Sequence, residues 1–124
     1  MPSYQLTNFL SVENMVSNNV MEWALDTLNR KLVQARQQKA KSQEGVDLVE
    51  LLQDRKQQLE LAMQLLVLRV QTGKLTMEDY RTTLEEKVKE ETERARMFKA
   101  QGNIPAAKMA LQRAKIMREE LAEC

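Results

Sequence analysis

Residues 59–70 form the most apolar window of the chain, and this window limits what the chain can fold into. Apolar residues start on one helical face and then continue all round the helix over residues 65–68. A helix that is apolar on every side has to be surrounded by other protein. The window is shorter than the about 20 apolar residues that cross a bilayer, and Gln64 and Arg69 interrupt it. We therefore expect the rod, as we name residues 59–70, to lie at the centre of a helical bundle.

The composition is typical of long helices in one small domain of 124 residues. A net charge of +1 gives no bulk attraction to nucleic acid or to membranes. Without histidine, and with Cys124 as the single cysteine, the chain lacks internal disulfides and the usual zinc or haem ligands. This cysteine usage predicts a reducing compartment, cytosol or nucleus, of which we expect the cytoplasm, and the N-terminus does not resemble a secretory signal. The helical pattern runs to the last residues, which suggests a piece of a longer protein.

Apolar periodicity predicts an all-α fold of about four helices, as an elongated antiparallel bundle or coiled-coil hairpins. The expected helices cover residues 20–40, 47–72, 77–101 and 104–122. They form one bundle over residues 19–124, after a lead-in over residues 1–18 that includes a short helix started by Ser11. Residues 37–45, rich in Gln, Lys and Ser, are expected to be a frayed end or a loop.

Several residues mark the ends of these helices. Asn19, with a glutamate three residues later, resembles a capping box. Thr76 and Asn103 are suited to cap the two last helices. Gly73 and Gly102 are suited to the left-handed conformation that ends many helices. The buried stripe of the last helix is expected to be Ile104, Ala107, Leu111, Ala114, Met117 and Leu121.

No pattern in the sequence points to catalysis. Carboxylates occur as neighbours, at Glu85-Glu86, Glu90-Glu91 and Glu119-Glu120. Adjacent residues of a helix point about 100° apart, so these pairs are interpreted as solvated faces. Serine and cysteine lack a histidine base, and the isolated glycines form no phosphate loop. We therefore predict that the chain is not an enzyme, with no catalytic, cofactor-binding or metal-binding residues.

Charge is segregated along the second half of the chain. Acidic residues prevail over residues 78–93, whereas every charged residue over residues 94–118 is positive. We name this second group the basic end: Arg94, Arg96, Lys99, Lys108, Arg113, Lys115 and Arg118. It suits an acidic helix, a phosphoinositide head group or RNA, although RNA is disfavoured because no exposed aromatic residue is expected there. Internal pairing with the acidic stretch, or with another copy of the chain, is the alternative.

Short motifs in the last two helices resemble a known family. They are Asp79-Tyr80, Leu84-Glu85, Gly102-Asn103, the run over residues 106–113, and Glu120-Leu121. These motifs are similar to the C-terminal helical segment of the Lgd-type family, the coiled-coil and C-two domain-containing proteins named for lethal giant discs. The resemblance covers the last third of the chain, and the earlier helices are compatible with it. A looser similarity, at Gly102, Ala107, Leu111 and Ala114, is to half a tetratricopeptide unit or to a microtubule-interacting-and-transport hairpin.

The resemblance implies a non-catalytic scaffold in endosomal sorting, where family members bind the membrane-scission polymer through basic helical hairpins. It also implies centrosomal or signalling roles for some members. The phospholipid-binding sandwich domain of that family is not present in this sequence. The only residues to which the resemblance extends a role are the basic positions near the matched hairpin.

The sequence thus predicts a protein–protein interaction module of a cytoplasmic scaffold or adaptor, linked to endosomal sorting. Its partner is expected to present an acidic or helical surface, and peripheral membrane contact stays open. The alternative is a self-associating coiled-coil dimerisation element of a structural, centrosomal or ciliary protein, whose seams over residues 21–35 and 48–70 pair between chains. The adaptor interpretation requires the rod to be covered by its neighbours in the chain.

Overall fold

The computed structural model describes residues 15–39 and 43–123 of the chain. Its helices are α2 (Asn18–Lys39), α3 (Gln43–Gln71), α4 (Met77–Ala100) and α5 (Ile104–Glu123). Over these residues the predicted fold class is confirmed, because the structure is all-α and its helices pack as antiparallel pairs. The short helix predicted to start at Ser11 lies outside the described residues.

The helices lie close to the expected ranges, with the largest difference at the start of α3. This helix begins at Gln43 and runs through Gly45, whereas residues 37–45 were expected to be a frayed end or a loop. Glycine destabilises the middle of a helix, but Gly45 lies in the first turn, where its conformational cost is smaller. The α2 helix likewise continues to Lys39.

Side-chain caps begin the helices, and one of them differs from expectation. The backbone N–H of Val20 donates to Ser17 Oγ at 3.1 Å, so Ser17 and not Asn19 caps α2. Thr76 caps α4 as predicted, because its Oγ1 accepts from the N–H of Asp79 at 3.1 Å. Asn103 Oδ1 accepts from the N–H of Ala106 at 3.4 Å at the start of α5. Gly73 and Gly102 have φ of 77° and 78°, the left-handed conformation expected of them.

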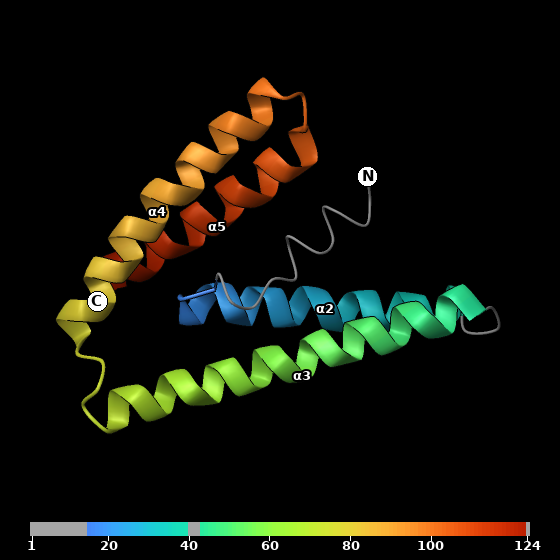
Figure 1. The fold of residues 1–124 in the computed structure, drawn as a ribbon, viewed down its shortest axis with the longest axis horizontal. Coiled ribbons are helices and arrows are strands. Elements are labelled where there is room, and N and C mark those ends of the chain that lie inside the picture. Colours follow the sequence, from blue (N-terminus) through green and yellow to red (C-terminus); the bar gives the residue numbers. More distant parts are fainter. Residues whose placement is uncertain (1–14, 40–42, 124) are drawn as a thin grey trace.

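The helices form two hairpins that diverge from the turn between α3 and α4 like the arms of a V (Figure 1). In the first hairpin α2 packs along α3, and in the second α4 packs along α5. The start of α2 also packs against α5, which joins the two hairpins at the base of the V. The end of α2 and the start of α3 therefore lie far from the connection between α4 and α5, at the open end of the V (Figure 1).

Apolar side chains are buried in separate clusters along these arms. The cluster between α2 and α3 contains Ala24, Leu28, Leu32, Leu52 and Leu59. A second cluster joins the two hairpins and contains Val20, Tyr80, Leu84 and Met117. A third, at the tip of the second hairpin, contains Phe98, Ala106 and Ala107. The core thus follows the V instead of surrounding one central helix.

The rod is not surrounded, so this prediction is wrong. Leu59 is only 1% exposed, but Leu61 is 56% and Leu68 53% exposed. The physical reason is that α2 packs along only one side of α3, and none of the other described helices covers the opposite side over its length. One side of the rod is therefore buried in the core, and the other side is exposed at the surface. Its exposed half is itself a candidate contact surface.

A hydrogen-bonded junction joins the hairpins where the start of α2 meets α4 and the end of α5. Glu120 Oε1 accepts from Ser17 Oγ at 2.5 Å and from the N–H of Asn19 at 3.3 Å. Glu120 Oε2 accepts from the Tyr80 hydroxyl at 2.5 Å, and that hydroxyl accepts from the N–H of Asn18 at 2.7 Å. Glu120 is buried, so its predicted place on a solvated face is wrong. Three donors satisfy its carboxyl oxygens inside the protein.

The junction also changes the acidity of Tyr80. Burial raises the pKa of the Tyr80 hydroxyl above its ordinary value, and the nearby Glu120 carboxylate raises this pKa further. The N–H of Asn18 lowers the same pKa in part. Tyr80 is therefore a neutral hydrogen-bond donor in the folded protein at ordinary pH.

Candidate functional site

The solvent-facing side of α5 combines apolar and positively charged residues. Ile104, Lys108, Leu111, Lys115 and Arg118 follow one another at alternating spacings of four and three, which places them on one side of the helix. We name these residues the α5 outer face. All of them are exposed, with Ile104 at 45% and Leu111 at 49%.

Ile104 and Leu111 were expected in the buried stripe of α5, and this prediction is wrong. The side of α5 that is buried is formed mainly by small residues: Ala106, Ala107, Ala110 and Ala114, with Met117. Alanine lets two helices approach closely, so the larger Leu111, one position beyond Ala110, is turned outward. The outer face is therefore apolar as well as basic.

The cations of the α5 outer face are available for a partner. Lys108 and Lys115 form no ion pair with any residue over 15–39 or 43–123. Arg118 makes one weak contact, in which its Nη2 donates to Thr92 Oγ1 at 3.4 Å. No acidic residue occurs between Arg94 and Arg118. The face thus presents positive charge beside exposed aliphatic side chains, which suits an acidic amphipathic surface.

Arg113, a member of the predicted basic end, lies inside the second hairpin. Its Nε and Nη2 donate to Glu91 Oε2 at 3.1 and 2.9 Å, and Arg113 is only 8% exposed. Arg94 Nη1 donates to the other oxygen, Glu91 Oε1, at 3.1 Å. This buried cluster corrects two predictions, because Glu91 is not on a solvated face and Arg113 is not available to a partner. The register of α4 against α5 brings the two residues together.

The members of the basic end on α4 differ in how accessible they are to a partner. Arg96 is exposed and pairs with Glu93 at 3.1 Å, a contact between two solvated side chains that holds them weakly. Lys99 is exposed in the last turn of α4. Arg94 is half-buried beside Glu91. The structure thus brings Lys108, Lys115 and Arg118 together on one face and separates them from Arg94 and Arg113.

A second exposed surface runs along α3, on the side away from α2. Asp54, Leu61, Leu65 and Leu68 recur at spacings of seven, four and three, and all of them are exposed. We name these residues the α3 outer face. It joins an acidic end to an apolar end. The sequence prediction covers these leucines because the rod is apolar nearly all round, but the pattern does not reveal how many helices cover α3.

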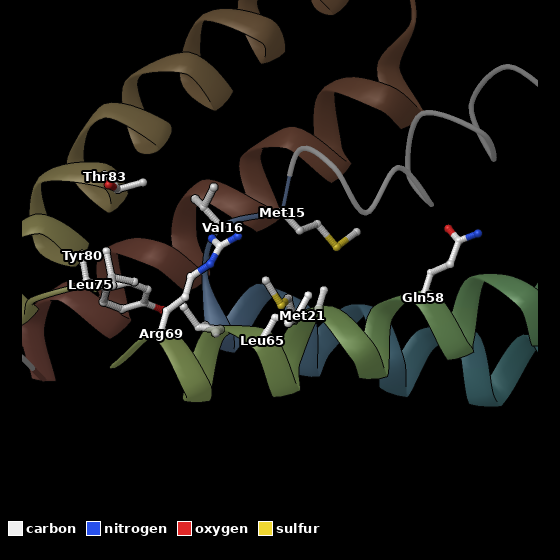
Figure 2. A pocket seen from close by; sticks show the side chains of 11 residues that line it. Met15, Val16, Met21, Gln58, Leu65, Arg69, Leu75, Tyr80 and Thr83 are labelled. Atoms are coloured by element: carbon white, nitrogen blue, oxygen red, sulfur yellow. The ribbon is translucent and has the colours of Figure 1, made fainter. Parts of the chain in front are cut away.

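A cavity of about 450 Å³ lies where the two arms of the V meet. Its lining is mainly apolar and comes from both hairpins, with Met21 on α2, Leu65 on α3 and Leu75 in the turn before α4. Arg69 and Thr83 add polar groups from α3 and α4 (Figure 2). The volume is within the range of ligand pockets, which is about 300–1,000 Å³. No sequence pattern indicates this cavity, because its walls belong to segments that are far apart in the chain.

Over the described residues, no group of three or more cysteine, aspartate or glutamate side chains could hold a metal ion. Of the helices that the structure describes, none combines the length and apolar character that crossing a bilayer demands. Comparisons with protein families, curated proteins and solved structures find no match to this chain.

Proposed function

We propose that this chain is a non-catalytic adaptor module that binds an acidic amphipathic helix of another protein on its α5 outer face. One observation carries the proposal. Lys108 and Lys115, which have no ion-pair partner among the described residues, alternate with the exposed Ile104 and Leu111 on one side of a helix. The exposed side of the rod removes the basis of the sequence interpretation, which required a covered rod, so the present proposal rests on the α5 outer face alone.

The chemistry of the face defines the partner. Burying the half-exposed Ile104 and Leu111 contributes about 1 kcal/mol each, since full burial of such a side chain is worth about 1.5–3 kcal/mol. Solvated ion pairs add about 0.2–1 kcal/mol each and are screened by salt. The partner therefore needs aliphatic residues and carboxylates on one face, at helical spacing. Binding should weaken as salt concentration rises.

The test uses a synthetic helical peptide of about 20 residues with leucine and glutamate on one face, and a scrambled peptide of the same composition. Fluorescence anisotropy should detect binding of the first peptide only. Reversing Lys108, Lys115 and Arg118 to glutamate should weaken binding about tenfold or more, which corresponds to about 1.4 kcal/mol. Arg113 is left unchanged, because reversing it would break the buried ion pair.

A matched control reverses the same amount of charge elsewhere. Arg36, Lys74 and Lys89 are exposed and lie outside the α5 outer face. Changing these three to glutamate should leave peptide binding close to that of the original chain, and circular dichroism should show unchanged helicity in both triple variants. Equal loss of binding in both would mean that only net charge matters, and this result would reject the α5 outer face as the site.

Binding to other acidic surfaces is a separate outcome of the same assay. Vesicles of phosphatidylcholine with phosphatidylserine test a membrane partner, and a single-stranded RNA tests a nucleic acid. Either ligand bound more tightly than the helical peptide would overturn the adaptor proposal. The extension to endosomal sorting in the cytoplasm is supported by the resemblance of the α4–α5 hairpin to the Lgd-type family. It is tested by capture of the membrane-scission polymer with the original and the reversed chain.

The alternative, dimerisation through the seams of the first hairpin, is less favoured. The apolar residues of those seams pack against each other within one chain, with Leu28, Leu52 and Leu59 almost fully buried. Their apolar surface is therefore already satisfied. Light scattering on serial dilution tests this alternative, because dimerisation through these seams would give a mass that stops at twice that of the monomer and would require the hairpin to open.

A further inference from the structure

We infer that the α5 outer face of one copy of this chain binds the α3 outer face of a second copy. The inference rests on the proposed function, because it names a partner for the same site. Both faces are exposed, and they lie on different hairpins of the V. The α5 outer face carries cations beside aliphatic side chains, and the α3 outer face carries leucines with one carboxylate, Asp54, which among the described residues accepts only from the neutral Gln58 Nε2 at 3.0 Å. The two faces therefore complement each other through their aliphatic side chains and one pair of opposite charges.

The spacing of the residues fits an antiparallel pairing of the two helices. On α3 the residues Asp54, Leu61 and Leu68 are separated by seven positions each. On α5 the residues Arg118, Leu111 and Ile104 are separated by the same intervals in the opposite direction. Aligning them places Asp54 beside Arg118, Leu61 beside Leu111, and Leu68 beside Ile104. Residues seven apart stay on nearly the same side of a helix, so the three pairs form one seam.

The flanking positions are compatible with the same alignment. Gln57 falls opposite Lys115, and Gln64 falls opposite Lys108, which gives each lysine a polar neighbour and no like charge. A parallel alignment would place Asp54 beside Ile104, and Leu68 beside Arg118. Each pair would then bury a charge against an aliphatic side chain, which is unfavourable. Charge and apolar pattern thus select the antiparallel orientation.

Because the two faces differ, the contact is heterologous. In an open assembly, the copy at one end still presents an unused α3 outer face, and the copy at the other end still presents an unused α5 outer face. Such contacts produce closed rings or open filaments, in contrast to the self-complementary contact of a twofold dimer. The average mass should therefore rise continuously with concentration.

The test uses two variants, each with one face disabled. Leu61→Glu with Leu68→Glu disables the α3 outer face, and Ile104→Glu with Leu111→Glu disables the α5 outer face. Sedimentation velocity should show concentration-dependent assembly for the original chain and monomers for each variant alone. An equimolar mixture of the two variants should form a one-to-one complex, because each retains the face that the other lacks. Val33→Glu, at an exposed position of α2, is the control and should assemble like the original chain.

A charge exchange tests the register. Asp54→Arg and Arg118→Asp should each weaken assembly, and the chain carrying both changes should recover it, because the pair is restored with reversed sign. Circular dichroism of every variant checks that the fold is kept. The inference would be overturned if the mixture of the two face variants stays monomeric. It would also be overturned if the α3 variant is monomeric while the α5 variant still assembles.

The outcomes separate this inference from the proposed function. If the original chain is monomeric up to about 1 mM but binds the acidic helical peptide, self-assembly is overturned and the adaptor function stands. If the chain assembles as described but does not bind the peptide, the α5 outer face binds only the α3 outer face of another copy. The adaptor function is then overturned. Failure of both measurements rejects both.

Discussion

At the scale of single residues, Glu91 holds the second hairpin in register. Its two carboxylate oxygens are divided between Arg113 on α5 and Arg94 on its own helix. Glu91 is 2% exposed, so its charge depends on these two guanidinium groups. Separating a buried carboxylate of this kind from its partners is costly. Sliding α4 along α5 would separate Glu91 from Arg113, so the ion pair opposes such a shift.

Glu91→Leu should lower the free energy of unfolding by about 3–5 kcal/mol, because it leaves the Arg113 guanidinium buried without a partner. Arg113→Met should cost less, since Glu91 then keeps Arg94. The chain with both changes should be more stable than the one with Glu91→Leu alone. Urea denaturation followed by circular dichroism measures all three. Equal costs for the two single changes would contradict this account of the cluster.

At the scale of elements, α3 shows which features of a helix pattern are sufficient for prediction. The existence of the helices, the caps Thr76 and Asn103, and the glycine ends follow from local chemistry, and all could be predicted. Whether the opposite side of α3 would also be covered could not be predicted, because Leu59 and Leu61 are equally apolar and differ only in which neighbour they meet. Periodicity also favoured Leu111 over Ala110 as the buried residue of α5. Close packing of the two helices selects the alanine instead.

The candidate site was predictable in part for the same reason. The run of positive charge over residues 94–118 is visible in the sequence, and Lys108, Lys115 and Arg118 are exposed within it. The sequence does not reveal that Glu91 faces Arg113, because their meeting depends on how far α4 is shifted along α5. Glu120 is a similar case, since its donors come from the start of α2 and from α4.

A matched pair of substitutions on α3 distinguishes its two sides. Leu59→Ala should cost about 2–5 kcal/mol, because it opens a cavity between α2 and α3. Leu61→Ala, two residues away on the exposed side, should change the stability by no more than about 0.5 kcal/mol. Both are measured from the midpoint and slope of urea unfolding at a concentration where the chain is monomeric. Similar costs at the two positions would mean that the rod is covered after all.

At the scale of the whole molecule, the junction of Ser17, Tyr80 and Glu120 connects the two hairpins. It joins the first residues of α2 to the first turn of α4 and the last turns of α5. Apolar contacts among Val20, Leu84 and Met117 surround it. Because Tyr80 both accepts and donates within this junction, its hydroxyl is the group whose removal is most informative.

Tyr80→Phe should destabilise the protein by about 2 kcal/mol at pH 8, because it removes a hydrogen bond to a carboxylate. In the original chain, folding raises the pKa of the Tyr80 hydroxyl, so the unfolded chain loses this proton first, near pH 10. The stability that comes from this shift is complete below about pH 10 and is lost as the pH rises further. The difference between the original chain and Tyr80→Phe should therefore shrink above that pH. Urea unfolding at several pH values measures it, and a constant difference up to about pH 11 would contradict the role of Tyr80 as a neutral donor.

The V shape has a geometric consequence for a chain that joins copies through unlike faces. The α3 outer face and the α5 outer face belong to different arms, so the angle between the arms fixes the rotation from one copy to the next. A rigid Glu120 junction would give a constant curvature and a defined ring or helical pitch. A loosened junction would give polymers of variable curvature from the same two contact surfaces.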